Sequence, residues 1–111
     1  MADTYIRIVS LWIHPGQELA FEAFEREASR IMTLHGGRIE RAVRIAGQEA
    51  ADAPFEVHVV SFPDRAAADS CAGDPETRNL RSRRAAIIAR TEILEGQEAG
   101  PYWAERLQKP R

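Results

Sequence analysis

Residues 55–96, which read FEVHVVSFPDRAAADSCAGDPETRNLRSRRAAIIARTEILEG, decide the fold of this chain. The segment starts with eight residues, 55–62, rich in valine and phenylalanine, a composition typical of a strand. Asp64 is a good N-cap for a helix that Gly73 interrupts, and Asp74-Pro75 restarts the helix with a cap and a proline at the first helical position. The second helical piece is predicted to reach residue 89, and residues 90–95 form a closing strand.

The chain before this segment supplies the other half of the fold. Residues 4–13 predict an apolar strand, residues 17–35 a helix with one apolar face, and residues 38–45 a second strand. The order β-α-β-β-α-β is that of a ferredoxin-like sandwich, an α+β fold in which two helices cover one face of a four-stranded antiparallel sheet. We expect residues 1–98 to form this domain and residues 99–111 a short C-terminal tail with helical character.

The apolar strands carry a further prediction about assembly. The usual strand order places the first and third strands in the centre of the sheet, and these two are the most apolar here. We expect His58, Val60 and Phe62 to lie on the sheet face that the helices leave uncovered. A large exposed apolar face indicates a partner, and sheet-to-sheet pairing of two copies is the simplest solution. The predicted partner is therefore a second copy of the chain, in a dimeric α/β barrel.

The composition excludes several classes of function. The formal net charge of −2 and the pI of about 5.9 argue against a nucleic-acid-binding protein, which usually has a strongly basic field. No apolar run approaches the roughly 20 residues that span a membrane, so we predict no membrane association. The single cysteine, Cys71, permits no internal disulfide and fits a reducing compartment. Together with the lack of a signal-peptide pattern at the N-terminus, these features predict a cytoplasmic protein.

Several motifs of the second half resemble a known family. They are Phe62-Pro63, the alanine run at 66–68, Asp74-Pro75-Glu76, Arg83-Arg84 followed by Ala85-Ala86, and the closing strand from Arg90 to Gly96. In these motifs the chain resembles the dimeric α/β-barrel superfamily and, within it, the domain-of-unknown-function family numbered 1330. The resemblance implies a ferredoxin-like subunit that pairs into a dimeric barrel, and it implies no established activity. The family commonly has aromatic residues where this chain has Cys71 and Ala72, so a pocket that they shape would differ here.

The candidate ligand-binding residues are arginines within apolar patterns. Arg84 shares a helical face with Leu80 and Ile87, and a buried guanidinium needs a carboxylate, a carbonyl group or an anionic ligand. It either recognises an acidic ligand or forms a structural ion pair with Glu56, Glu92 or the dimer partner. A one-residue ambiguity in the pattern leaves Arg83 as an alternative to Arg84. Arg41 either joins Arg84 in a small positive pocket between sheet and helices or extends to water from an edge strand.

His58 is the best candidate for a general base. Its position in the middle of a strand is predicted to face the interior between two sheets, with Trp12 nearby as a candidate ligand-binding side chain. The alternative is a hydrogen-bonded histidine in an interface. The three histidines lack the spacing of a zinc motif and Cys71 lies in no CxxC motif, so we predict no metal site and no cofactor.

Two functional hypotheses follow. In the first, the protein is a small dimer that binds a small acidic molecule between sheet and helices, with acid–base or oxygenation chemistry that needs no cofactor. In the second, it is a non-enzymatic dimeric interaction module without a small-molecule substrate, and Tyr102-Trp103 contacts the partner. No nucleophile motif, paired carboxylates or phosphate-binding loop favours another reaction.

Overall fold

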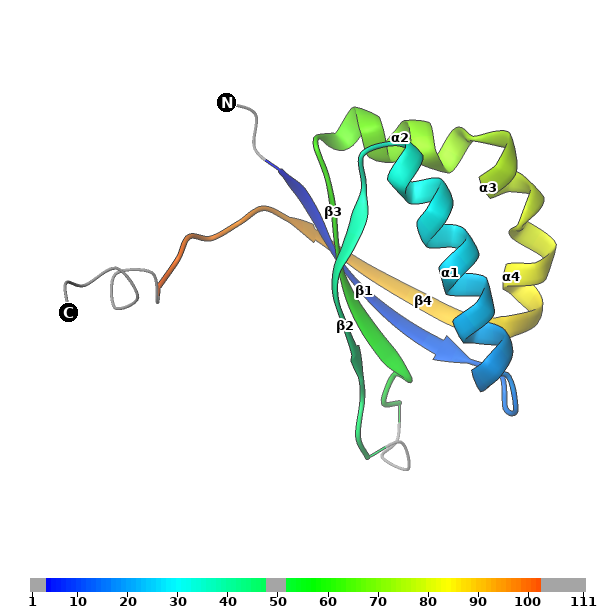
Figure 1. The fold of residues 1–111 in the computed structure, drawn as a ribbon. Coiled ribbons are helices and arrows are strands. Elements are labelled where there is room, and N and C mark those ends of the chain that lie inside the picture. The colour runs from blue at the N-terminus through cyan, green and yellow to red at the C-terminus, as the bar shows by residue number, and fades with distance from the viewer. Residues whose placement is uncertain (1–3, 48–51, 103–111) are drawn as a thin grey trace, which may run out of the picture.

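The computed structural model describes residues 4–47 and 52–102 of the 111-residue chain. Its elements follow the predicted order, with the second helical region divided into three pieces (Figure 1). The elements are β1 (Tyr5–Ile13), α1 (Glu18–Leu34), β2 (Arg38–Arg44), β3 (Glu56–Phe62), α2 (Arg65–Gly73), α3 (Pro75–Asn79), α4 (Arg81–Ile87) and β4 (Ile88–Gly96).

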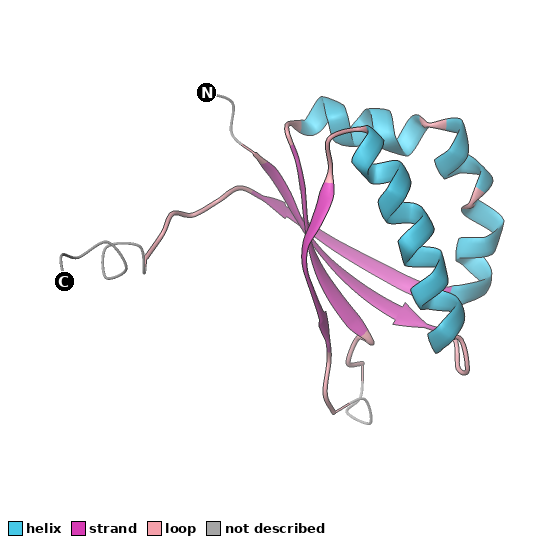
Figure 2. Cartoon of the chain, viewed as in Figure 1, coloured by secondary structure: helices cyan, strands magenta, loops and turns pink. Residues whose placement is uncertain are grey.

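The four strands form one antiparallel sheet in the order β2-β3-β1-β4. The prediction that the first and third strands are central is confirmed. The register places Val9 of β1 opposite His58 of β3 on one side and opposite Ile93 of β4 on the other. All the helices lie on one face of this sheet (Figure 2), so the fold is the expected ferredoxin-like α+β sandwich.

The face of β3 that packs against the helices is the opposite of the predicted one. Val60 and Phe62, which are 5% and 4% exposed, pack with Ala68 of α2, and His58 is also buried. The prediction that these three side chains look outward is therefore wrong. Side chains alternate along a strand, so Val57 and Val59 lie on the uncovered face instead. β3 is apolar on both faces, which is why alternation along the sequence does not distinguish them.

The core lies between this sheet face and the helices. One cluster joins the α1 phenylalanines to Leu11 of β1 and to the start of β4, with Phe21 and Phe55 in an edge-to-face contact whose ring centroids are 5.4 Å apart. Its buried members are Leu11, Phe21, Phe24, Phe55, Ile87 and Ile88. Phe21 and Phe24 lie on one face of α1 at the predicted helical spacing.

The interruptions of the second helical region have local causes. The Asp64 side chain caps α2 by accepting a hydrogen bond from the Ala67 amide, and Asp74 caps α3 by accepting one from the Glu76 amide. An additional break, at Leu80, separates α3 from α4, although no glycine or proline marks it. The closing strand begins at Ile88, two residues before the predicted start, because the Ile88 backbone is already extended.

The uncovered face of the sheet carries exposed apolar side chains. Ile8, Val43 and Leu94 are 36%, 45% and 71% exposed, and Ile8 is paired directly with Leu94 across β1 and β4. Val43 lies opposite Val57 on the same face. This surface, defined by Ile8, Val43, Val57, Val59 and Leu94, is called the open sheet face below.

After β4 the chain leaves the body of the domain, as Figure 1 shows for residues 97–102. Tyr102 is 85% exposed. Trp103 and Leu107, which the predicted tail contains, lie outside the described residues. Within the described ranges, none of the helices has the length and apolar character that crossing a membrane requires.

Candidate functional site

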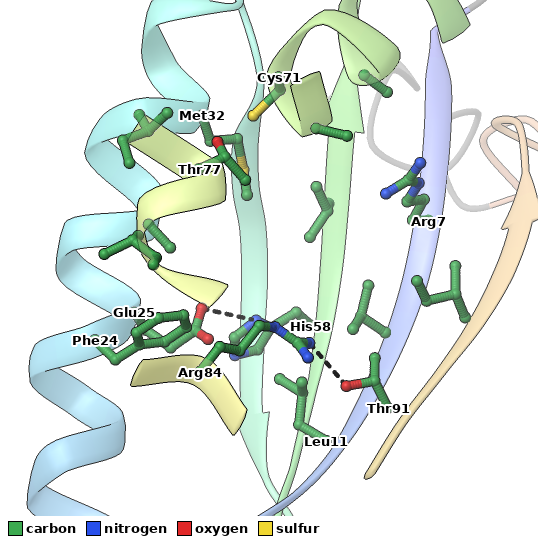
Figure 3. Close-up of a pocket in the computed structure, with 18 of the residues that line it drawn as sticks. Arg7, Leu11, Phe24, Glu25, Met32, His58, Cys71, Thr77, Arg84 and Thr91 are labelled. Carbon is green, nitrogen blue, oxygen red and sulfur yellow. Dashed lines mark hydrogen bonds and ion pairs between the residues drawn. The ribbon is translucent and has the colours of Figure 1, made fainter. Parts of the chain in front are cut away.

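A cavity of about 250 Å³ lies between the sheet and the helices. Its walls come from β1, β3 and β4 on the sheet side and from α1, α2, α3 and α4 on the other. Most of the lining is apolar, but two arginines, a glutamate and a histidine also reach it: Arg7, Arg84, Glu25 and His58 (Figure 3). An apolar cavity with a few polar groups is the usual form of a small-molecule site.

Arg84 extends from α4 into this cavity. Its Nη2 donates a hydrogen bond of 2.8 Å to the Thr91 hydroxyl oxygen on β4. Among the described residues, no carboxylate oxygen lies within 4 Å of its guanidinium nitrogens. The ion pairs considered from the sequence do not form, because Glu56 binds Arg44 and Glu92 binds Arg90. Arg84 is thus a partly buried cation held in place by a neutral hydroxyl group.

The neighbouring Arg83 points elsewhere. It is exposed, and its guanidinium carbon lies 5.5 Å from the centroid of the Phe24 ring. The ambiguity between the two arginines is therefore resolved in favour of Arg84 as the one that lines the cavity.

Arg41 and Trp12 do not reach the cavity. Arg41 is exposed and pairs with Val59 on the open sheet face, so the positive pocket with Arg84 does not form and the alternative, an edge-strand arginine that extends to water, is the one seen. A register shift between Ile39 and Arg41 explains the error, since one extra residue reverses the alternation along β2. Trp12 also lies on the open face, where the Arg90 guanidinium stacks 4.1 Å from its ring centroid.

His58 is fixed by two carboxylates. Its Nε2 lies 2.6 Å from Glu56 Oε2, and its Nδ1 lies 3.8 Å from Glu25 Oε1. Glu56 also accepts a 2.9 Å hydrogen bond from Nε of Arg44. A carboxylate oxygen accepts hydrogen bonds, so the 2.6 Å contact assigns the donated proton to His58 Nε2, and in the neutral ring Nδ1 holds the lone pair. His58 therefore faces the helices and not a second sheet, and its role as a base stays a prediction.

Glu25 is a site residue that the sequence interpretation missed. It projects from α1 into the cavity beside His58 and Arg84 (Figure 3). Burial raises the pKa of the Glu25 carboxyl, and electrostatic interaction with His58 and Arg84 opposes this rise only in part. The sequence contains a sign of this position. Glu25 interrupts the apolar face of α1 between Phe21 and Ala28, at spacings of four and three residues.

Arg7 is the second missed residue. It lies in the middle of the apolar strand β1 and lines the cavity (Figure 3). Its Nε donates a 3.0 Å hydrogen bond to the Tyr5 hydroxyl. Cys71 also lines the cavity, where burial raises the pKa of its thiol while a hydrogen bond with Thr77 lowers it. The sequence signal that could have identified Arg7 is a charged residue within an apolar strand.

The other two histidines have structural contacts outside the cavity. His14 Nε2 lies 3.2 Å from the Ala85 carbonyl oxygen. His35, at the C-terminal end of α1, lies 2.7 Å from Asp74 Oδ2 and so links α1 to the cap of α3. Within residues 4–47 and 52–102, no three histidine, cysteine or acidic side chains converge on a point where they could hold a metal ion.

Solved structures with the same fold come from several bacteria. An uncharacterised protein from Rhodopseudomonas palustris superposes with a TM-score of 0.75 and 14% identity over 91% of this chain and 86% of its own. A mutant of SnoaB, a cofactor-independent oxygenase from Streptomyces nogalater, gives 0.74 and 13% over 91% and 98%. A dabb family protein with a ferredoxin-like fold from Mesorhizobium loti gives 0.66 and 16% over 89% and 100%. At these identities the likeness concerns the fold.

No curated protein matches the chain at a significant level. The family comparison is more specific. The model of the domain of unknown function DUF1330 matches residues 8–97, which include all the strands and helices apart from the first three residues of β1. The match contains Arg84, His58 and Glu25, whereas Arg7 lies one residue outside it. The chain therefore belongs to the DUF1330 family of ferredoxin-like domains.

Proposed function

We propose that this protein binds a small organic acid in the cavity and that Arg84 holds the carboxylate of that acid. The observation that carries the proposal is the Arg84 guanidinium, which reaches a largely apolar cavity without a carboxylate partner among the described residues. Glu25 acts on this charge only through space, so the guanidinium lacks a hydrogen-bonded counter-ion, and a ligand carboxylate would supply one through a bidentate, charge-assisted contact. Thr91 orients the guanidinium for this contact.

His58 supplies the chemistry of the proposed site. With its Nε2 proton bound to Glu56, its Nδ1 lone pair can accept a proton from an acidic C–H or O–H group of the ligand. Glu56 stabilises the imidazolium that forms, as the carboxylate does in a carboxylate–histidine dyad. The anion left behind is electron-rich, and such anions react with oxygen without a cofactor. The SnoaB neighbour, a cofactor-independent oxygenase, supports this class of reaction for a protein of the same fold.

Binding is tested with a panel of aliphatic and aromatic carboxylic acids in a thermal-shift experiment. The chain offers a matched pair of variants, because Arg83 and Arg84 are adjacent on α4 and only Arg84 lines the cavity. We expect acids that bind to raise the Tm of the wild type and of Arg83→Met, and to leave the Tm of Arg84→Met unchanged. If no acid stabilises the wild type, or if both variants respond alike, the proposal is wrong.

The proton transfer has its own test. A panel of 2-oxo acids that bind in the first experiment is incubated with the protein in D₂O, and exchange of the hydrogen next to the carbonyl group is followed by NMR. We expect exchange with the wild type and its loss in His58→Gln, with acid binding retained. Exchange that persists at the wild-type rate in His58→Gln would assign the base to another residue.

We also propose that two copies pair through the open sheet face. The support is the exposed apolar surface formed by Ile8, Leu94 and Val43 on a face that none of the helices in the described residues covers. In light scattering, Leu94→Glu is expected to give a monomer, whereas Leu19→Glu, on an exposed position of α1, is expected to leave the dimer intact. A monomeric wild type would contradict the pairing. A dimer whose cavity binds no acid would instead favour the non-enzymatic interaction module.

Two predictions from the sequence stay predictions. The cytoplasmic location rests on the single cysteine and on the N-terminal pattern. The contact of the C-terminal tail with a partner rests on Tyr102 and on residues beyond it that lie outside the described ranges.

A further inference from the structure

The cavity has a second cation, Arg7, that the proposed function does not use. Its only hydrogen bond among the described residues joins Nε to the Tyr5 hydroxyl, so four of its five N–H groups are left for a ligand. No described carboxylate lies within 4 Å of it. Glu95, which faces Arg7 across the β1–β4 pair, is bound instead to Arg65 at 3.0 Å.

Arg7 and Arg84 lie at different levels of the sheet. The Arg84 side chain is bound to Thr91, and Thr91 is paired with Leu11 of β1. Arg7 and Leu11 are four residues apart on the same face of β1, which corresponds to about 13 Å along the strand. The two guanidinium groups therefore face the same cavity from positions well separated along its length (Figure 3).

The wall between these two positions is apolar. Val9 lies midway between Arg7 and Leu11 on β1, and Ile93 lies opposite it on β4; both line the cavity. Val60, opposite Arg7 on β3, continues this surface. A ligand that satisfied both arginines would therefore have an anionic group at each end and an apolar body between them.

We propose that the ligand of this cavity is a dicarboxylic acid, with one carboxylate on Arg84 and the other on Arg7. This inference rests on the proposed function, because it requires that Arg84 binds a carboxylate. It adds the class of ligand: an extended molecule that carries two carboxylates on an apolar body. A monocarboxylate of the same length fills the same apolar wall but leaves Arg7 unpaired.

Calorimetry with the wild-type protein tests the inference without any variant. The probes are the straight-chain dicarboxylates from succinate to sebacate, each compared with the monocarboxylate that has the same number of carbons. We expect the dicarboxylate of best-fitting length to bind at least roughly tenfold more tightly than its monocarboxylate counterpart, because a charged hydrogen-bonded contact is added. We also expect a maximum at an intermediate length, since the two sites are a fixed distance apart.

Two variants locate the second carboxylate. Arg7→Met is expected to reduce dicarboxylate affinity to that of the matched monocarboxylate and to leave monocarboxylate affinity unchanged, whereas Arg84→Met weakens both. The Tm of each variant without ligand shows whether it folds. If Arg7→Met does not fold, Arg7→Lys, which keeps the charge, replaces it in the comparison.

The outcomes separate the two proposals. If monocarboxylates bind through Arg84 and dicarboxylates bind no more tightly at any length, the dicarboxylate inference is wrong and the proposed function stands. If Arg7→Met retains the full preference for dicarboxylates, the second carboxylate lies elsewhere and the inference is also wrong. If neither class binds, both proposals are wrong.

Discussion

Replacement of Glu56 by alanine should destabilise the fold more than any loss of a surface ion pair. The Glu56 carboxylate receives hydrogen bonds from His58, at 2.6 Å, and from Arg44, at 2.9 Å. The His58 side chain is 4% exposed, so its bond counts as a buried charged hydrogen bond worth about 1.5–3 kcal/mol. Arg44 is 46% exposed, so the contribution of its hydrogen bond to stability is that of a surface ion pair, below about 1 kcal/mol. The expected loss of unfolding free energy is therefore about 1.5–4 kcal/mol.

The assay is urea unfolding followed by circular dichroism at one fixed protein concentration, because the proposed dimer would make the apparent stability depend on concentration. Glu56→Gln keeps the shape and one acceptor, so it should lose about half of the alanine effect, roughly 1–2 kcal/mol. The matched control is Glu95→Ala, since Glu95 and its partner Arg65 are 45% and 60% exposed and their pair is worth below about 1 kcal/mol. Equal losses in Glu56→Ala and Glu95→Ala would refute the reasoning.

Three further predictions concern charge and packing. Burial raises the Glu25 pKa above 4.5, so near that pH the folded state binds more protons than the unfolded state. The stability of the wild type should therefore fall as the pH rises from 4.5 through the raised pKa. Urea unfolding at several pH values should show that Glu25→Gln gains stability relative to the wild type over that range. The hydrogen bond from His35 lowers the Asp74 pKa below 3.8. The ionised Asp74 carboxylate therefore stabilises the fold above pH 3.8, and this contribution is lost as the pH falls through the lowered pKa. The stability advantage of the wild type over Asp74→Asn should shrink on acidification. Gly37→Ala places a methyl group 2.6 Å from Cδ1 of the Phe62 ring and should cost about 1–3 kcal/mol in urea unfolding.

Each of these predictions has a control or a contrary result. A constant difference between wild type and Glu25→Gln across the pH series would mean that the carboxyl does not titrate differently on folding. Asp74→Asn preserves a good N-cap residue, so a loss that is independent of pH would point to the cap and not to the charge. Gly73→Ala adds a methyl group with no atom within 4 Å, and it should cost less than Gly37→Ala.

Much of the fold could be predicted because its signals are local. The caps at Asp64 and Asp74 act on amides two or three residues away, and both form as expected. The order of the elements and the central position of the two apolar strands followed from composition and length. The break at Leu80 was not predictable in this way, since no glycine or proline marks it.

The site was harder to predict because it depends on which face of each strand is buried. β3 has valines on both faces, so the alternation gave no preference and the wrong face was chosen. The extra residue between Ile39 and Arg41 then moved Arg41 to the open sheet face. Arg84 was predicted more successfully, because a helix has one apolar stripe and a charged residue within it stands out. The same reasoning applied to Glu25 of α1 would have identified another charged group of the cavity.

The charged side chains on the two sides of the sheet differ in whether they have partners, and this difference predicts where an anionic ligand would lie. On the β2–β3 side, Glu56 is satisfied by Arg44 and His58, so little positive charge remains there for an anion. On the β1–β4 side, Arg7 and Arg84 are without carboxylate partners among the described residues. An anionic ligand should therefore lie along β1 and β4, which places its middle next to His58 on the adjoining strand. Arg7 and Arg84 would thus anchor the ligand, while His58 would exchange a proton with a different part of the same molecule.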